Sequence, residues 1–375
     1  MKDTFIVADN IISPLGRDTA ENFSKLKKSN TGIKEHFSPA IADQPFYAAL
    51  LDHNALSDFS DAAHTKFEQL LIASITEALQ NTVVDLTDKR TVLIISTTKG
   101  NISLLETSQM DAALKKRIAL HSSARVVAEH FNCVNKPIVI SNACISGSLA
   151  LLAGKRLVQS GQYGDAVVAG ADVISKFVLS GFQSFQAIST GHCKPFDINR
   201  TGINLGEGAA TIILSSLPQG AAVKIAGGSV SNDANHISGP SRTGQELCIA
   251  INKAISDADL SEKDINYISA HGTATLYNDE MEALAINLAN LQLVPVNSLK
   301  GYYGHTLGAA GLIESVVAVH SMKQDLVLPS IGFSEMGVSK PINISTGLHK
   351  LSLTHCLKTA SGFGGCNAAI IFSKV

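Results

Sequence analysis

Short apolar runs alternate along the chain with segments of helical periodicity. The runs are rich in Val and Ile and are continuous, which predicts strands that are covered on both faces. Strands that alternate with helices are typical of an α/β protein with mostly parallel strands. The predicted strands span residues 5–7, 92–96, 138–141, 166–169, 210–214, 223–226, 265–269, 294–297 and 368–372.

Three of the segments between these runs carry clear helical patterns. Residues 307–320 are apolar almost all round and include Gly308 and Gly311, so they predict a buried helix that its neighbours approach closely. The other two segments are amphipathic. Their apolar stripes consist of Phe67, Leu71, Ile75 and Ala78 in the first, and of Leu247, Ala250, Ile251, Ala254 and Ile255 in the second.

The order of these elements repeats, although the residues hardly do. FIVADNIISP, the Phe67 helix, TVLIISTTKG and PIVISNACISGSLALLAG form one series; VKIAGGSVSND, the Leu247 helix, INYISAHGTAT and VPVNSLKGYYGHTLGAAGLIESVVAV form the other. We interpret them as two duplicated halves, residues 1–216 and 217–375, that pack into one body. Any α/β protein shows some alternation of this kind, so the order of elements alone leaves both interpretations open.

Composition and charge narrow the classes of function. The chain has 375 residues, is 45% hydrophobic and carries a formal net charge of −2, so no basic field points to nucleic acid. No uninterrupted apolar stretch reaches the roughly 18 residues that a membrane span needs. The first apolar run is broken by Asp9 and Asn10 and lacks a signal-peptide pattern.

Six cysteines are scattered through the chain without any C-x-x-C pair. In a chain of this length, that argues against a disulfide framework or a structural zinc site and favours a reducing cytoplasm. Most of these thiols are expected to be small buried hydrophobes.

One cysteine, Cys144, stands in a distinctive context, PIVISNACISGSLALLAG. A strand ends, Cys144 lies at the turn and a helix begins within a residue or two, as in a nucleophile elbow. Gly147 and its small neighbours Ser146 and Ser148 are expected to let the first helical turn crowd against the strand. The helix N-terminus favours a thiolate with a lowered pKa and can hold an oxyanion. A lone cysteine in this position is more often simply buried, so the interpretation depends on companion motifs.

Two histidines follow strands in the second half. A strand delivers His271 in YISAHGTATLYNDEMEALAI, where Asn278 is a candidate helix cap before Asp279 and Glu280. A strand also delivers His305 in VNSLKGYYGHTLGAAGLIES. Each alone is more often a core histidine than a catalyst. By the duplication, however, the His305 unit matches the Cys144 unit, so the two would face each other as a nucleophile arrangement.

A glycine-rich segment, KTASGFGGCNAAIIF, precedes the last strand. Gly362, Gly364 and Gly365 surround Phe363 and predict a loop that approaches another group closely or adopts positive φ. A backbone N–H in such a loop could form the second arm of an oxyanion hole. A plain hairpin turn explains the glycines equally well.

Together the motifs resemble a known family. NACISG, AHGTAT followed by NDEMEA, KGYYGHTLGAAG and SGFGG, in that order, look like the elongating β-ketoacyl-acyl carrier protein synthases. IISPLG, CKPFDINRTGINLGEGAA and SNDANHIS at 231–238 agree, so the resemblance covers nearly the whole chain. It implies a thiolase-like α/β fold, with two duplicated βαβ halves in five alternating layers.

The resemblance also implies a reaction and roles for individual residues. Cys144 would carry the acyl group, and His271 and His305 would stabilise the enolate formed when a malonyl extender loses carbon dioxide. Lys300 would complete the electrostatics, Glu282 would support the site, and the backbone N–H groups of Cys144 and Phe363 would form the oxyanion hole. Phe363 would also gate the acyl tunnel. The implied enzyme has no cofactor or metal, takes acyl and malonyl groups from acyl carrier protein, and forms a homodimer or a heterodimer with a chain-length factor.

The sequence departs from the family pattern around the acyl pocket. The stretch between Gly100 and Pro137 is short, and Asn142 and Ser361 stand where Thr and Phe are usual. A specialised pathway, such as a polyene pigment or another polyketide, is therefore as open as fatty-acid synthesis. A degradative thiolase would need a second cysteine at Ser361, whereas Cys366 follows the glycines. A non-catalytic partner subunit would lack Cys144, although this chain could still be the active half of a heterodimer.

Overall fold

In this computed structural model, which describes residues 2–52, 56, 63–234 and 239–375, two series of elements have the same order. The first series builds a five-stranded arrangement, β5-β4-β6-β8-β1, and the second builds β11-β10-β14-β15-β9. The strands are β1 (Phe5–Ile12), β4 (Thr91–Ser96), β5 (Ile138–Ile140), β6 (Asp165–Asp172) and β8 (Gly208–Ser215) in the first series, and β9 (Val223–Asn232), β10 (Tyr267–Ala270), β11 (Val296–Ser298), β14 (His355–Gly362) and β15 (Cys366–Lys374) in the second.

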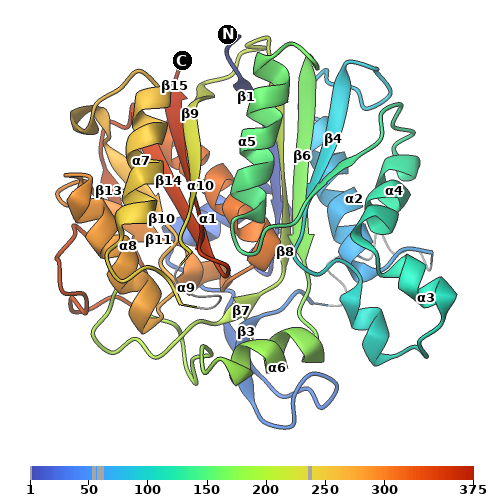
Figure 1. Cartoon of the computed structure of the whole chain (residues 1–375), viewed down its shortest axis with the longest axis horizontal. Helices are drawn as coiled ribbons and strands as arrows, with labels where there is room; N and C mark the ends of the chain where they lie inside the picture. Colours follow the sequence, from blue (N-terminus) through green and yellow to red (C-terminus); the bar gives the residue numbers. More distant parts are fainter. Residues whose placement is uncertain (1, 53–55, 57–62, 235–238) are drawn as a thin grey trace.

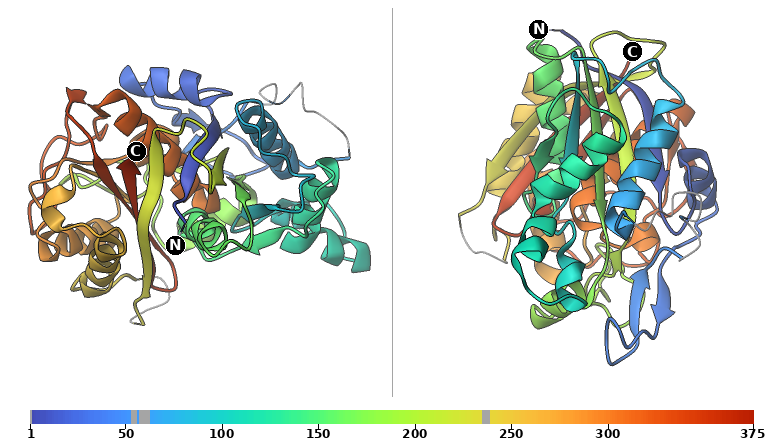
Figure 2. Two further views of the ribbon diagram at one scale, coloured as in Figure 1. Left: turned by 90° about the horizontal axis from the view of Figure 1, so that it is seen from above. Right: turned by 90° about the vertical axis from the view of Figure 1, so that its right-hand side faces the viewer.

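The helices repeat in the same way, so five layers alternate. Helices α5 (Ser146–Gln159) and α10 (Ala310–Gln324) lie between the two groups of strands, and two pairs of helices cover the outer faces (Figures 1 and 2). The outer helices are α2 (Lys66–Leu79) and α4 (Leu120–His130) on one side, and α7 (Gln245–Asp257) and α8 (Leu276–Leu288) on the other. This arrangement confirms the expected duplicated architecture, while the boundary between residues 216 and 217 stays a prediction.

The two groups of strands are joined through β1 and β9, which pair only at Phe5 and Lys224, so all ten strands form one sheet. Within each group, four strands run in one direction, and β8 in the first group and β15 in the second run opposite to them. The expectation of mostly parallel strands is therefore confirmed within each group, except for the opposed strands β8 and β15. Strands that are buried on both faces look alike in sequence whichever way they run, so the pattern could not reveal the direction of β8 and β15.

The smaller elements surround this framework. Helix α6 and the short strands β3 and β7 lie at the end of the molecule opposite both termini (Figure 1). The full set of smaller elements is α1 (Thr19–Lys27), β2 (Lys34–His36), β3 (Phe46–Ala49), η2 (Ile102–Glu106), α3 (Ala112–Arg117), α6 (Lys176–Ser184), β7 (Leu205–Gly206), η3 (Glu262–Asp264), α9 (Lys300–Tyr303), η4 (Leu307–Ala309), β12 (Leu326–Val327) and β13 (His349–Lys350).

The central helices approach each other at glycines. A Cβ on Gly147 would lie 2.8 Å from the backbone nitrogen of Leu312, and one on Gly311 would lie 2.5 Å from the nitrogen of Ser148. Helix α5 thus crowds against α10, not against the preceding strand as the sequence had suggested. The close packing predicted for residues 307–320 is confirmed, with the first turn wound as the 3₁₀ segment η4.

Within the described ranges, no helix has both the length and the apolarity to cross a membrane. The six cysteines are all free thiols. No cluster of three or more His, Cys, Asp or Glu side chains suited to a metal ion occurs among the residues placed by the structure.

Candidate active site

Cys144 lies in the turn between β5 and α5, as predicted. The turn needs a left-handed residue, Ala143, whose φ is 44°. Ser146 fixes it: its hydroxyl accepts the N–H of Asn142 at 2.8 Å and donates to the carbonyl of Ala143 at 2.7 Å. Helix α5 then begins at Ser146. This local geometry holds the sulfur at the start of a helix that is itself buried.

The environment of the Cys144 thiol differs from the expectation. Its residue is only 8% exposed, and burial raises the pKa of the thiol to about 12, with the nearby Cys366 acting in the same direction. Lys300, the backbone N–H of Phe363 and Lys99 oppose this rise. The prediction of a lowered pKa was therefore wrong, because desolvation outweighs these favourable contacts. At neutral pH, Cys144 is a thiol that needs a proton acceptor before it can react.

His271 follows β10 and is fixed through its backbone. The carboxylate of Glu282 accepts the N–H groups of His271 at 2.8 Å and Gly272 at 2.7 Å, and the hydroxyl of Thr359 at 2.6 Å. Glu282 comes from helix α8 and is fully buried. Its role is thus to orient the turn that presents the imidazole.

The cap predicted for α8 was wrong. The helix begins at Leu276, with Thr275 as the N-cap residue, so Asn278 lies inside the first turn. Asp279 instead reaches back and accepts the N–H groups of Thr273 at 2.9 Å and Ala274 at 3.2 Å. These bonds tie the helix to the turn that carries His271.

His305 lies between α9 and η4, so helix α9 separates it from strand β11, and the prediction that a strand delivers it was wrong. Backbone bonds hold it from both sides. Its N–H donates to the carbonyl of Asn204 at 2.7 Å, and its own carbonyl accepts the N–H of Gly206 at 3.0 Å. Its ring centroid is 5.4 Å from that of His271, with an interplanar angle of 83°. Neither ring nitrogen of His305 has a hydrogen-bond partner within the described part of the chain. The imidazole is therefore open to a ligand.

Both imidazoles are neutral at physiological pH. Burial lowers the pKa of His271 and of His305 well below the ordinary histidine value, and the cations Lys300 and Lys358 act in the same direction. A neutral imidazole can accept a proton at one nitrogen and donate a hydrogen bond from the other. Either histidine could thus take the proton of a reacting thiol or donate to a developing oxyanion.

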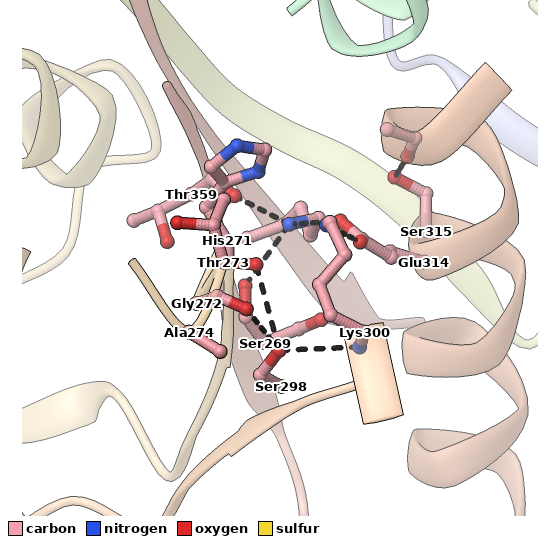
Figure 3. Close-up of polar contacts among 12 residues, drawn as sticks. Ser269, His271, Gly272, Thr273, Ala274, Ser298, Lys300, Glu314, Ser315 and Thr359 are labelled. Atoms are coloured by element: carbon pink, nitrogen blue, oxygen red, sulfur yellow. Dashed lines mark hydrogen bonds and ion pairs between the residues drawn. The ribbon is translucent and has the colours of Figure 1, made fainter. Parts of the chain in front are cut away.

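Lys300 lies beneath the histidines at the start of α9 and is completely buried. Its ammonium contacts the carboxylate of Glu314 on α10, as Figure 3 shows. The same carboxylate binds Lys358 of β14 at 2.8 Å. Sequence reasoning missed Glu314 and Lys358. GLIES had been interpreted as an apolar helix, and the strand that carries Lys358 was not predicted at all.

Phe363 and its glycines close the site above Cys144. Gly364 and Gly365 have φ values of 86° and 73°, and a Cβ on Gly362 would lie 2.9 Å from the nitrogen of Cys144. The segment is the hairpin turn between β14 and β15, and it also has the positive φ and the close approach that the sequence left open. The ring of Phe363 packs on Phe182 at 5.7 Å and on Phe185 at 5.3 Å between centroids.

Four of the predicted site residues meet at one cavity of about 610 Å³, namely Cys144, His271, His305 and Phe363, whereas Lys300 and Glu282 lie behind its lining. A second cavity of about 210 Å³ also reaches Cys144 and is bordered by Lys99 and Phe177. Phe182, Phe185 and Phe363 border both spaces. This aromatic group thus separates two approaches to one sulfur atom. Ser361, one of the departures from the family pattern, lines the larger cavity, and Thr98 lines the smaller.

Comparison with known proteins agrees with this geometry. Residues 1–220 match the N-terminal domain of β-ketoacyl synthases, and residues 222–334 match the C-terminal domain. The chain belongs to the β-ketoacyl synthase family. The family assignment confirms the predicted enzyme class, a condensing acyltransferase, and agrees with the argument from Ser361 against a degradative thiolase.

Individual relatives cover the chain to different extents. A putative mitochondrial 3-oxoacyl-[acyl-carrier-protein] synthase of Schizosaccharomyces pombe is 26% identical over 100% of this chain and 99% of its own length. 3-oxoacyl-[acyl-carrier-protein] synthase 2 of Vibrio harveyi is 26% identical over 97% of each. The chloroplastic synthase II of Arabidopsis thaliana is 33% identical over 62% of this chain, but the match spans only 46% of the plant protein.

Solved structures share the fold along the full chain. A ketosynthase of Xenorhabdus doucetiae, solved in complex with its chain length factor, has a TM-score of 0.85 and 25% identity, covering 100% of this chain and 98% of that one. A β-ketoacyl synthase of Burkholderia phymatum has a TM-score of 0.90 and 24% identity over the whole of both chains. These β-ketoacyl synthases confirm the expected thiolase-like fold.

Proposed function

We propose that this β-ketoacyl synthase joins an acyl group held on Cys144 to a malonyl-type extender, both delivered by acyl carrier protein. The observation that carries the proposal is the convergence of one thiol, two neutral imidazoles and the Phe363 backbone on a single cavity. The proposal assigns the thiol to residues 1–216 and both histidines to residues 217–375, with no cofactor.

In the first half-reaction, the sulfur of Cys144 bonds to the carbonyl carbon of the incoming thioester. The thiol proton passes to one of the neutral imidazoles, and the carrier thiol leaves with a proton. The backbone N–H groups of Cys144 and Phe363 would stabilise the tetrahedral oxyanion. Because burial raises the pKa of Cys144 to about 12, this proton transfer is a necessary part of the step.

In the second half-reaction, the carbon–carboxylate bond of the malonyl thioester breaks and carbon dioxide leaves. The electron pair forms an enolate, whose oxygen accepts hydrogen bonds from His271 and His305. The enolate carbon attacks the acyl carbonyl on Cys144, the carbon–sulfur bond breaks and the thiolate recovers its proton. Lys300 and Glu282 support this step by holding the charge and the position of the histidines.

The test is to load the purified protein with acyl-carrier proteins of several chain lengths and to measure the mass of the Cys144 peptide. An acyl adduct on Cys144, followed by β-ketoacyl product on addition of malonyl-carrier protein, is the expected result. Absence of both the adduct and the product, with every carrier tested, would overturn the proposal. The chain length that loads fastest would also identify the pathway, whether fatty-acid or polyketide, including polyene pigment synthesis.

A partner subunit is a second part of the proposal. Strand β5 is the last strand of the ten-stranded sheet, and all three of its residues, Ile138, Val139 and Ile140, are half-buried, which leaves apolar surface for another chain. We propose a homodimer formed in the cytoplasm, with a heterodimer as the alternative, since a relative was solved with its chain length factor. Size-exclusion chromatography of the chain expressed alone separates the cases: an active homodimer excludes an obligate partner. Inactivity that a partner subunit restores would favour the heterodimer, and a chain that never loads would be a non-catalytic subunit.

A further inference from the structure

Lys358 is a buried cation that neither the family resemblance nor the proposed reaction uses. It lies on β14 with no exposed surface, and its ammonium donates to the carbonyls of Ser269 at 3.3 Å and of Thr359. Its third contact is the carboxylate of Glu314 at 2.8 Å. Ser269 lies two residues before His271, so Lys358 contacts the strand that delivers a histidine.

The charges around it are balanced. Lys300 and Lys358 are the two cations beneath the imidazoles, and Glu282 and Glu314 are the two carboxylates. A buried charge costs free energy unless an opposite charge and hydrogen bonds compensate it. With only one of the lysines, the cluster would carry an excess negative charge next to His271 and His305. An excess negative charge stabilises the protonated imidazolium.

We propose that Lys358 is a positioning residue that balances the buried carboxylates and so keeps His271 and His305 unprotonated for the reaction. The inference rests on the proposed function, because it assigns Lys358 a task in the same two half-reactions. It extends that function by making the working pH range of the enzyme depend on a residue that touches neither substrate nor sulfur.

Geometry and electrostatics agree on the direction in which Lys358 shifts the pKa of the two histidines. Lys300 and Lys358 both act to lower the pKa of His271 and of His305. Removing Lys358 would therefore raise the pKa of each imidazole, and activity that needs the neutral ring would be lost at a higher pH than in the wild type. Burial raises the pKa of Asp279 to about 7, and its carboxylate lies 3.9 Å from the guanidinium of Arg200. Asp279 is present in every variant of the test below, so it does not affect the comparison between them.

Other ionisable groups border the cluster and are unchanged in the test. They are Asp279 and Glu282 from α8, Lys300 from α9, Cys144 from the turn before α5, Lys99 and Asp172 from the segments beside it, Asp233 after β9, Cys356 from β14 and Cys366 from β15.

The test compares Lys358→Met, Glu314→Gln and the double variant. Met keeps most of the volume of the lysine stem and removes the charge, so the single variant leaves two carboxylates and one cation. The double variant restores one of each. The measurement is the pH dependence of acyl loading on Cys144, run beside an NMR titration of the histidine ring carbons. The NMR titration reports protonation without requiring activity.

We expect the acidic limb of loading to move upward by about one pH unit in Lys358→Met and to return to the wild-type position in the double variant. Glu314→Gln alone leaves an excess positive charge, so its acidic limb should not move upward. A purely structural role for Lys358 predicts no recovery in the double variant, because that variant lacks the lysine as well.

The outcomes separate this inference from the proposed function. If the wild-type protein never loads an acyl group, the function fails, while the NMR titration still tests the charge balance. If the wild type loads and Lys358→Met keeps the wild-type acidic limb and ring titration, the inference is overturned. If Lys358→Met does not fold but the double variant folds with a wild-type limb, charge balance is supported. Failure of both to fold would assign Lys358 a structural role instead.

Discussion

The rings of His271 and His305 lie nearly perpendicular, with centroids 5.4 Å apart. His271 follows strand β10 and His305 follows helix α9, and among the described residues each is anchored through its backbone and not through its ring. This leaves both imidazoles free to point donors at one small group. An enolate oxygen is such a group, so the histidine pair leads directly to a test that separates the two half-reactions.

Decarboxylation should require both histidines but not the sulfur. Cys144→Gln removes the nucleophile and leaves an amide that can occupy the oxyanion hole, so this variant should release carbon dioxide from malonyl-carrier protein without forming condensed product. Adding His271→Ala or His305→Ala should reduce that release about a hundredfold, since one lost donor costs on the order of 3 kcal/mol in barrier. Labelled carbon dioxide is the measurement. The exposed His349→Ala serves as the matched control, and undiminished release in both histidine variants would remove their assigned role.

The reactivity of Cys144 should rise steeply with pH. Because burial raises the pKa of its thiol to about 12, the thiolate fraction should grow about tenfold per pH unit from pH 7 to 10. Alkylation with a neutral reagent, followed by peptide mapping, measures the rate. Cys133 is the internal comparison, because it is half-buried, has a pKa raised to about 11 and lies outside both cavities. A labelling rate at Cys144 that levels off near pH 7 would contradict the raised pKa and would instead support the activated thiolate that the sequence had suggested.

The burial of Cys144 explains why sequence reasoning failed on the pKa of its thiol while it succeeded on the position of the residue. The strand–turn–helix motif could be predicted from ISNACISG, and so could the strand end that carries His271, whereas His305 follows helix α9 and not a strand. Burial of the sulfur could not, because it depends on the Phe363 loop and on α10, which are distant in sequence. The pKa of a thiol follows its desolvation, and desolvation is a property of the assembled fold.

Shortening Phe363 should change substrate entry more than folding. Its ring separates the two cavities and packs on Phe182 and Phe185, so Phe363→Ala should alter the relative loading rates of short and long acyl groups several-fold. Stopped-time loading with both acyl classes measures the ratio, and thermal unfolding checks the fold. Phe37→Ala, at a ring that is 68% exposed, is the control. An unchanged ratio and unchanged rates would show that Phe363 is not a gate.

Glu282 should matter for stability and for catalysis together. Glu282→Ala would leave the N–H groups of His271 and Gly272 and the hydroxyl of Thr359 without an acceptor, which should lower the free energy of unfolding by about 2–4 kcal/mol. Glu282→Gln keeps one acceptor oxygen and should cost less. Denaturant unfolding gives the order of the variants. As a control, Glu129→Gln at an exposed position should leave the free energy of unfolding unchanged. Equal stability of Glu282→Ala and the wild type would contradict the assigned hydrogen bonds.

The parts of the fold that escaped sequence reasoning are those that serve the site. Strand β14 carries Lys358 and Thr359 in its buried centre. Because these residues are polar, the segment lacked the apolar pattern from which strands were predicted. Asp279 looks like a first-turn acid next to a capping Asn278, yet its carboxylate binds the preceding turn. In each case, a polar side chain was assigned by its local preference, whereas a contact with a distant element decides its position.

The contact between α5 and α10 at Gly147 and Gly311 has a consequence for how this scaffold can diversify. Because backbone meets backbone there, the distance between the helix that follows the thiol and the helix that follows His305 does not depend on the size of any side chain. The walls of the larger cavity are built elsewhere, on α6, α8 and the Phe363 loop. Substitutions can therefore reshape what enters the enzyme without shifting the atoms that react, so new substrate ranges can arise while the chemistry is inherited unchanged.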